Sequence, residues 1–419
     1  MSEPHILTFG CRLNAYESEV MRAHAAATAS GVETVIINTC AVTAEAERQA
    51  RQAIRKLRRE RPDARIVVTG CAAQVHPEKF AAMAEVDQVL GNVDKMQPDA
   101  FQAPASDRPA SDRIVVTDIM QVREVASHLV SGFEGRARAF VEVQQGCDHR
   151  CTFCIIPFGR GPNRSVPVAR VVGQVRELVA QGFNEVVLTG VDITSYGGDL
   201  PERPGLGTLV RRLLAEVPEL PRLRLSSLDP VGVDAVLLAA VAEEARLMPH
   251  FHLSVQAGDD MVLKRMKRRH SRDDVLRLAE RLRDLRGDVA LGADLIAGFP
   301  TEDDDMFRQS LDLVDEAGFS HLHVFPFSPR PGTPAARMPQ VNGAVAKERA
   351  AVLRTRGEAT MAAFLASRIG REAHVLVEGD GEGFCEHYLP VTVANGRPGE
   401  LMTVRIGGVA NGRLEGQRP

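Results

Sequence analysis

The stretch "GCDHRCTFC", residues 146–154, places Cys147, Cys151 and Cys154 close together in a chain that has seven cysteines in all. It follows the run "AFVEVQQ", which predicts a strand ending at the first cysteine. Structural zinc sites usually have four protein ligands, and no fourth cysteine or paired histidine lies at zinc-finger spacing. Three thiolates instead leave one iron of a cubane iron-sulfur cluster open for a further ligand. The stretch therefore predicts such a cluster, with a zinc site or buried apolar thiols as the alternatives.

The strand before these cysteines is the first of six. Residues 139–328 contain the runs "AFVEVQQ", "EVVLTG", "LRLSS", "FHLSVQ", "VALGADLIAG" and "HLHVFPFS", and a helical pattern separates each pair. Six β/α units predict an open, partial version of the eight-stranded β/α barrel. Because loops after the carboxyl ends of barrel strands form the active site, the cysteines lie where chemistry is expected.

A different α/β pattern precedes the barrel. Residues 4–116 alternate β-branched runs with segments rich in helix formers, which predicts a doubly wound parallel sheet. Cys11, Cys40 and Cys71 each follow one of its first three strands. Since the carboxyl ends of parallel strands meet along one edge, these thiols are expected to converge on a second cluster. The alternative is three unrelated thiols of apolar strands.

The end of the chain changes pattern again. After a helical stretch over 343–369, the runs "AHVLVEG", "LPVTVAN" and "ELMTVRIGG" alternate apolar and polar residues, which predicts a small antiparallel β barrel. A chain of 419 residues is too long for one ordinary core. The predicted domains are therefore an N-terminal α/β domain at 1–118, a partial barrel at 133–365 and a β domain at 367–419.

Composition restricts the partners and the compartment. The net charge of −4 and the pI near 6.3 give no overall positive field, so a polyanion site must be local. No run is long enough for a membrane span, and "MSEPHILTFG" lacks the features of a signal peptide. We therefore expect a cytoplasmic protein without a membrane partner. In that reducing compartment, clustered cysteines are metal ligands more often than disulfides.

Two segments concentrate positive charge. Residues 48–65 space arginines at helical intervals, which is consistent with a phosphate-contacting face and equally with a solvated one. The segment "KRMKRRH" at 264–270 follows the fourth barrel strand, and this position favours contact with a nucleic acid backbone. Its candidate residues are Lys264, Arg265, Lys267, Arg268 and Arg269.

Several motifs resemble known enzymes. The C-x3-C-x2-C loop is similar to the signature of radical S-adenosylmethionine (SAM) enzymes, in which the open iron binds the cofactor. The stretches "TFGCRLNAYESE", "INTCAVTAEAE", "VTGCAAQ", "DLIAGFPTED" and "FPFSPRPGTPAA" resemble the methylthiotransferase family over nearly the whole chain. The form "GCRLN" is most similar to the branch acting on N6-threonylcarbamoyladenosine (t6A) at position 37 of tRNA. The last domain resembles the small RNA-binding β module called TRAM.

This resemblance implies a reaction and its components. Two 4Fe-4S clusters would be held by the two cysteine triads, and SAM would supply both a 5′-deoxyadenosyl radical and a methyl group. The substrate C–H bond would receive a methylthio group by radical chemistry, because no side-chain base can remove so weakly acidic a hydrogen. The implied partners are the anticodon loop of tRNA and an electron donor such as a flavodoxin or a ferredoxin.

Further site residues are expected from their positions on the barrel. Radical SAM enzymes carry a Gly-Gly-Glu segment after the second strand, where this chain has Gly190, Val191 and Asp192. Residues at strand ends are expected to contact the cofactor, and the alternative for them is hydrogen-bonded barrel filling. The predicted cofactor contacts are Gly190, Asp192, Gln256 and Asp294.

Two arginines follow the cysteine loop in "FGRGPNRS". Arg160 and Arg164 are bidentate donors that suit a substrate carboxylate or an RNA phosphate. Pairing with acidic neighbours is the alternative.

Other functions share parts of this pattern. Related branches modify isopentenyladenosine in tRNA or an aspartate of a ribosomal protein, and the polarity of the substrate pocket would distinguish them. A non-catalytic iron-sulfur protein that binds RNA is a candidate of another class. Open coordination positions argue against it, because purely structural clusters are usually fully ligated.

Overall fold

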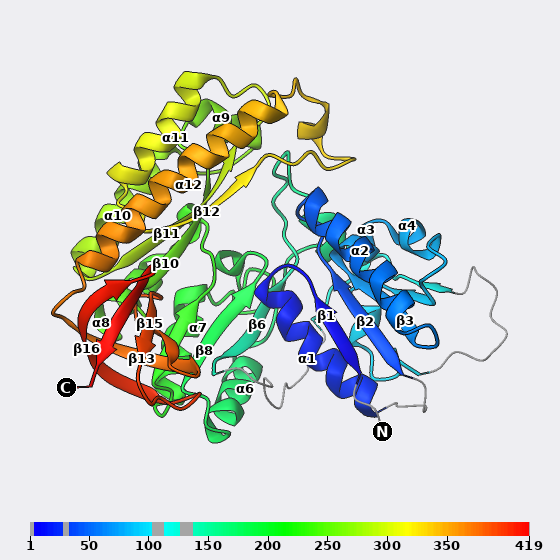
Figure 1. Ribbon diagram of the computed structural model, residues 1–419, viewed down its shortest axis with the longest axis horizontal. Coiled ribbons are helices and arrows are strands. Elements are labelled where there is room, and N and C mark those ends of the chain that lie inside the picture. Colours follow the sequence, from blue (N-terminus) through cyan, green and yellow to red (C-terminus); the bar gives the residue numbers. More distant parts are fainter. Residues whose placement is uncertain (1–3, 28–32, 103–112, 126–136, 419) are drawn as a thin grey trace. The chain divides into compact units, whose positions relative to one another are not determined.

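A computed structural model describes residues 4–27, 33–102, 113–125 and 137–418 (Figure 1). The chain divides into two compact units. The first contains Met1–Val130, Gln144–Val166 and Ser328–Thr333, and the second contains Ser131–Val143, Pro167–Phe327 and Pro334–Pro419. This division differs from the three expected domains, because the cysteine loop at 146–154 groups with the N-terminal segment and the last β domain groups with the barrel.

A five-stranded sheet forms the centre of the first unit. Its strands lie in the order β1-β2-β3-β4-β5, and each neighbouring pair is parallel. They are β1 (His5–Thr8), β2 (Thr34–Thr39), β3 (Arg65–Gly70), β4 (Gln88–Leu90) and β5 (Ile114–Val115). The helices of this segment are α1 (Arg12–Ala27), α2 (Ala44–Glu60), α3 (Cys71–Val75) and α4 (Pro77–Ala81).

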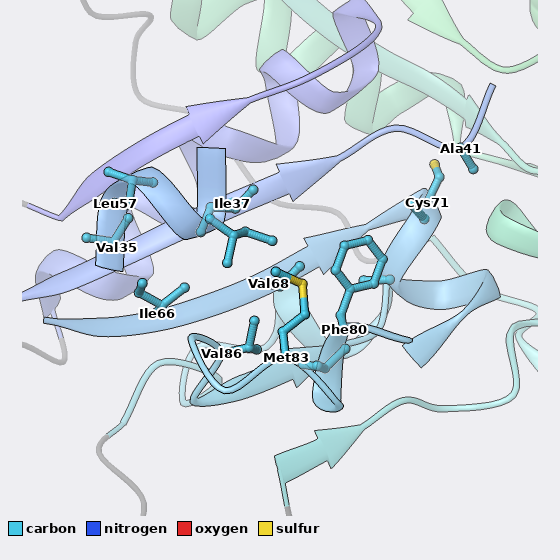
Figure 2. Close-up of a cluster of buried hydrophobic side chains, with 14 of the residues drawn as sticks. Val35, Ile37, Ala41, Leu57, Ile66, Val68, Cys71, Phe80, Met83 and Val86 are labelled. Carbon is cyan, nitrogen blue, oxygen red and sulfur yellow. The ribbon is translucent and has the colours of Figure 1, made fainter. Parts of the chain in front are cut away.

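Helices cover both faces of this sheet. On one face, Met21 and Ala25 of α1 pack against Ile36 and Val67. The other face packs against α2, α3 and α4 through a larger cluster, which includes Val35, Ile37, Ile54, Leu57, Ile66, Val68, Phe80 and Met83. Figure 2 shows Cys71 beside Ala41 at one end of that cluster. The period-2 alternation of apolar residues therefore places one set of side chains on each face, as the doubly wound prediction requires.

The segment around the cysteine loop completes the first unit. It contains α5 (Ile156–Arg160) and the short strand β7 (Arg164–Ser165), which pairs antiparallel with Gln144 and Gln145 at the end of β6 (Ala139–Gln145). Helix α5 packs against α3, the helix that begins at Cys71. Both predicted cysteine triads thus belong to the same unit.

The second unit contains the partial barrel. Strand β6 begins it, β8 pairs with β9, and β10, β11 and β12 follow in parallel. Bridges from Leu223 to Leu247 and from Leu228 to Leu253 connect the two sheets. The later strands are β8 (Glu185–Gly190), β9 (Arg222–Leu225), β10 (His250–Gln256), β11 (Ala290–Ala297) and β12 (His321–Pro326). The helices are α6 (Val168–Ala180), α7 (Leu206–Glu216), α8 (Ala235–Glu243), α9 (Asp260–Met266), α10 (Arg272–Leu285), α11 (Asp304–Glu316) and α12 (Gly343–Ala366).

A closed five-stranded β barrel ends the chain. Its strands are β13 (Glu372–Gly379), β14 (Glu382–Cys385), β15 (Pro390–Val393), β16 (Leu401–Ala410) and β17 (Arg413–Gln417), in the order β13-β14-β15-β17-β16. The three predicted folds are therefore confirmed. Among the described helices, none is both long and apolar enough to cross a membrane.

Candidate metal centres and substrate surface

The N-terminal triad forms at the carboxyl ends of three neighbouring strands. Cys40 directly follows β2, Cys71 follows β3, and Cys11 lies three residues beyond β1. Gly10 has a φ of 98°, and a Cβ at that position would lie 2.9 Å from the sulfur of Cys40. Only glycine therefore lets the loop that carries Cys11 approach Cys40 this closely.

The thiols of this triad influence one another. Burial raises the pKa of Cys40 to about 12, and the neighbouring Cys71 and Cys11 add to the increase. Cys71 and Cys11 therefore lie close enough to Cys40 to affect its charge, and a cluster on these three thiols stays a prediction. All three cysteines are free of disulfides. Burial also raises the pKa of Cys11, and because metals bind thiolates, an iron cluster there would replace the protons of Cys11 and Cys40.

The second triad lies on a loop that is closed by its own backbone. Gly146 has a φ of 71°, and a Cβ there would lie 1.8 Å from the carbonyl oxygen of Pro162. The amide of Cys147 donates to the Gly161 oxygen at 3.0 Å, and that of Cys154 donates to the Cys151 oxygen at 3.1 Å. Three half-buried thiols that form no disulfide, all on such a loop, fit the donor set of an open 4Fe-4S cluster.

Arg160 joins the surroundings of the two triads. Its Nε donates to the Cys71 sulfur at 3.1 Å, and its Nη2 donates to Asn14 at 2.5 Å. The same guanidinium forms an ion pair with Glu17, which also pairs with Lys95 at 2.7 Å and accepts from Gln145 Nε2 at 3.2 Å. The side chains of Arg160, Glu17 and Lys95 are at most 2% exposed. Arg160, expected to contact substrate or RNA, is instead buried beside a predicted cluster ligand.

Arg164 also has a structural position. It is 4% exposed, and its guanidinium donates to the backbone oxygens of Pro162 at 3.0 Å and Arg160 at 3.1 Å. These contacts hold the turn that follows the cysteine loop. Contact of Arg164 with a carboxylate or a phosphate stays a prediction.

Glu17 was not predicted from the sequence, although a signal exists. It lies on α1 among Leu13, Tyr16, Val20 and Met21, which form the buried face of that helix. A carboxylate on an apolar face requires a buried partner. Burial would raise its pKa, but Arg160 and Lys95 outweigh this effect and lower it to about 2.

The predicted cofactor residues lie on strand ends of the second unit. Gly190 is the last residue of β8, and the carboxylate of Asp192 accepts from the hydroxyls of Thr194 and Ser195 at 2.6 Å. Gln256 ends β10 with a φ of 75°. A non-glycine residue in the left-handed region costs about 1–3 kcal/mol, and such strain is concentrated at functional sites.

Asp294 is held by two histidines that were not predicted. Its Oδ1 accepts from His252 Nε2 at 2.9 Å and lies 3.2 Å from His323 Nδ1. Burial would raise the pKa of Asp294, but the two imidazoles lower it well below 3.8. In register, Asp294 lies opposite His323 on β12, so the three side chains share one face of the sheet. The carboxylate is therefore ionised and oriented.

The basic segment after β10 separates into two groups. Arg268 is bound to Asp229 at 2.9 Å and to the Ser254 oxygen at 2.7 Å, and Arg265 donates to the Thr301 oxygen at 3.2 Å. These two arginines therefore hold the local fold. The exposed members are Lys264, Lys267 and Arg269.

The arginines of α2 do not form a free basic face. Arg48 pairs with Glu45, Arg51 with Glu47, and Arg58 with Asp87. Arg58 also donates to the backbone oxygens of Pro62 and Ala64. The solvated reading of this helix is therefore the better one.

The two aromatic residues available for base stacking in the last domain are engaged inside the second unit. Phe384 and Tyr388 stack on each other with centroids 4.9 Å apart, and Arg138 lies over both rings. Arg224 donates to the oxygens of Cys385 and Glu386 at 2.7 and 2.9 Å. The β barrel is thus fixed to the β/α barrel through these residues.

Comparisons with known proteins agree with this architecture. A model of the Radical SAM superfamily matches residues 141–314, and one of the uncharacterized protein family UPF0004 matches residues 3–91. The radical SAM methyltransferase TsrM from Kitasatospora setae, solved with cobalamin and a 4Fe-4S cluster, has a TM-score of 0.53. The match covers 75% of this chain and 68% of that chain at 18% identity, a likeness of fold.

Curated relatives extend over the whole chain. The threonylcarbamoyladenosine tRNA methylthiotransferase MtaB of Rickettsia prowazekii is 48% identical, over 98% of this chain and 96% of that protein. Its namesake in Thermotoga maritima is 35% identical, over 97% and 94%. The tRNA-2-methylthio-N(6)-dimethylallyladenosine synthase of Paracoccus denitrificans is 36% identical, over 98% and 96%. With this full-length similarity and both cysteine triads in place, the chain belongs to the radical SAM methylthiotransferase family, whose enzymes use SAM and 4Fe-4S clusters.

Proposed function

We propose that the protein converts t6A at position 37 of tRNA to its 2-methylthio derivative by radical SAM chemistry. The observation that carries this proposal is the presence of two cysteine triads in one compact unit, with Arg160 reaching from the loop of one triad to a thiol of the other. The 48% identical relative supports the choice of t6A over the dimethylallyl substrate, for which the reported relative is 36% identical.

Each triad has its own role. Cys147, Cys151 and Cys154 would hold the cluster that binds SAM, and Cys11, Cys40 and Cys71 would hold the second one. When bound, the first cluster supplies the electron that cleaves SAM and the second supplies the site from which sulfur reaches the substrate. The chain's own contribution is to keep three thiols of each set at one place through Gly10, Gly146 and the loop hydrogen bonds.

The strand ends of the second unit would orient the cofactor. Asp294 is ionised and held by His252, so its carboxylate suits the hydroxyl groups of a ribose. Gln256 offers an amide from a strained backbone position. Gly190 and Asp192 stay predictions for the amino end of SAM, since Asp192 here accepts from two hydroxyls of its own turn.

The substrate is tRNA, and its backbone would meet exposed cations of the second unit. Lys264, Lys267 and Arg269 are the exposed residues of the basic segment. Target bases of RNA loops can be unstacked and bound in a pocket, as chemistry on position 37 requires. A flavodoxin or a ferredoxin as electron donor, and a cytoplasmic location, are parts of the same proposal.

Cysteine variants test the two roles separately. In anaerobically reconstituted protein, Cys151→Ala should abolish reductive cleavage of SAM, whereas Cys40→Ala should retain cleavage and lose sulfur insertion. Cys385→Ala is the matched control, because this thiol is 1% exposed inside the small barrel and far in sequence from either triad. Full sulfur insertion by Cys40→Ala would refute the assignment of the second cluster.

The substrate is tested in cells. Mass spectrometry of tRNA nucleosides should show 2-methylthio-t6A with the gene and only t6A without it. Loss of the 2-methylthio derivative of isopentenyladenosine instead would assign the protein to the other tRNA branch.

A further inference from the structure

Arg160 has a position that the reaction scheme does not use. It is the last residue of α5, six residues beyond Cys154, and its guanidinium lies 3.1 Å from the sulfur of Cys71. Its remaining donors go to Glu17, Gln145 and Asn14. All five N–H groups of an arginine can be used in this arrangement, which fixes the orientation of the guanidinium.

Arg160 also belongs to a buried network of polar side chains. Arg160 and Lys95 both contact the carboxylate of Glu17, and burial lowers the pKa of Lys95. The other partners of Lys95 are the neutral oxygens of Asn38 and Asn92, at 3.3 and 2.8 Å. The Cys71 sulfur accepts from Arg160 Nε at 3.1 Å, and Asn92 Nδ2 lies 3.8 Å from the same sulfur. A buried guanidinium requires acceptors for its N–H groups, and a metal-bound sulfur at Cys71 would be one of them.

We propose that Arg160 is a positioning residue of the second cluster, which orients the Cys71 thiolate and raises the reduction potential of the iron-sulfur group that this thiolate holds. Hydrogen bonds to ligand sulfurs and nearby net charge are the means by which proteins set such potentials. A buried positive charge at 3.1 Å stabilises the added electron because the local dielectric constant is low. The inference rests on the proposed assignment of a cluster to Cys11, Cys40 and Cys71.

The test measures potential rather than activity. Replacing Cys147, Cys151 and Cys154 by alanine in the full chain leaves one cluster, whose reduction is followed by electron paramagnetic resonance in a redox titration. If this background binds no iron, the assignment of the second cluster fails. If it binds iron, the potentials of further variants test Arg160 alone.

The expected shifts have opposite signs. Arg160→Met should lower the ratio of reduced to oxidised cluster at a fixed poise at least tenfold, or about 59 mV for a one-electron couple. Glu17→Gln removes a negative charge beside the same guanidinium, so it should raise that ratio. Arg160→Lys keeps the charge and should shift it less than Arg160→Met does.

Arg330→Met is the matched control. Arg330 forms a buried ion pair with Glu47 in the same unit at 2.6 Å, and that contact involves no cysteine. This variant should leave the potential unchanged. Shifts of the same sign in Arg160→Met and Glu17→Gln, or no larger shift in Arg160→Met than in Arg330→Met, would overturn the proposal. If Arg160→Met binds too little iron to titrate, Glu17→Gln alone tests the proposal. A lower reduction potential of the cluster in Glu17→Gln than in the parent protein would then overturn it.

Discussion

Glu185 is expected to be the charge on which attachment of the last domain depends. This carboxylate is fully buried at the start of β8, and three arginines surround it: Arg222 at 2.8 Å, Arg224 at 2.9 Å and Arg138 at 3.5 Å. Glu185→Gln keeps the shape of the side chain and leaves three buried cations without their shared anion. Breaking a buried ion pair in this way costs about 3–5 kcal/mol.

Thermal unfolding of the full chain measures this cost. For a domain of some 150–250 residues, 1 kcal/mol corresponds to about 2–4 °C, so the unfolding temperature should fall by about 6 °C or more. The control is Glu378→Gln, which removes a carboxylate 2.8 Å from Arg138 that is 35% exposed. A partly exposed ion pair contributes about 0–1 kcal/mol, so this variant should stay within a few degrees of the wild type.

The effect of Glu185→Gln should also depend on pH. Burial would raise the pKa of Glu185, but the three arginines outweigh it and lower the pKa below its ordinary value of 4.5. A carboxylate with a lowered pKa stabilises the fold above its unfolded-state pKa, and this contribution is lost as the pH falls below 4.5. The difference between wild type and variant should therefore shrink in acid. An unchanged unfolding temperature at neutral pH would refute the idea that this ionic cluster holds the two barrels together.

Three further variants test the cysteine loop and the basic segment. Gly146→Ala should lose about half of the bound iron on reconstitution, because its Cβ would lie 1.8 Å from the Pro162 oxygen; iron analysis showing full loading would contradict this. Lys267→Gln should weaken tRNA binding and reduce the slope of log affinity against log salt concentration by about 0.7–0.9. Arg268 forms an ion pair with Asp229, so Arg268→Gln should mainly lower the unfolding temperature. Equal salt slopes in wild type and Lys267→Gln would exclude that contact.

The sequence predicted where the N-terminal cysteines lie in the fold, because their positions follow from strand phase; their role as cluster ligands stays a prediction. Cys40 and Cys71 each directly follow a buried strand. Parallel strands have their carboxyl ends at one edge of the sheet, irrespective of how the connecting helices pack. The spacing within 147–154 likewise needs only a local loop. These inferences depend on short-range pattern, which a single sequence contains.

The partners of buried charges could not be predicted in the same way. Glu17 and Arg160 are 143 residues apart in sequence, and nothing local indicates that they meet. An arginine beside a cysteine loop therefore looks identical whether it binds phosphate or a buried carboxylate. The histidine pair around Asp294 became visible only through the register of β10, β11 and β12.

The charge composition of the last domain can be compared with the contacts that this domain makes with arginines of the β/α barrel. Residues 367–419 contain six arginines, no lysine and seven acidic residues, so the domain has no basic excess that would by itself indicate an RNA-binding surface. Glu378 pairs with Arg138 at 2.8 Å, and the backbone oxygens of Cys385 and Glu386 accept from Arg224. Both arginines belong to the β/α barrel and are buried, so they hold the small domain in place and add no positive charge to its surface. Arg138 also lies over the rings of Phe384 and Tyr388, so the two aromatic residues of this domain are part of the same attachment.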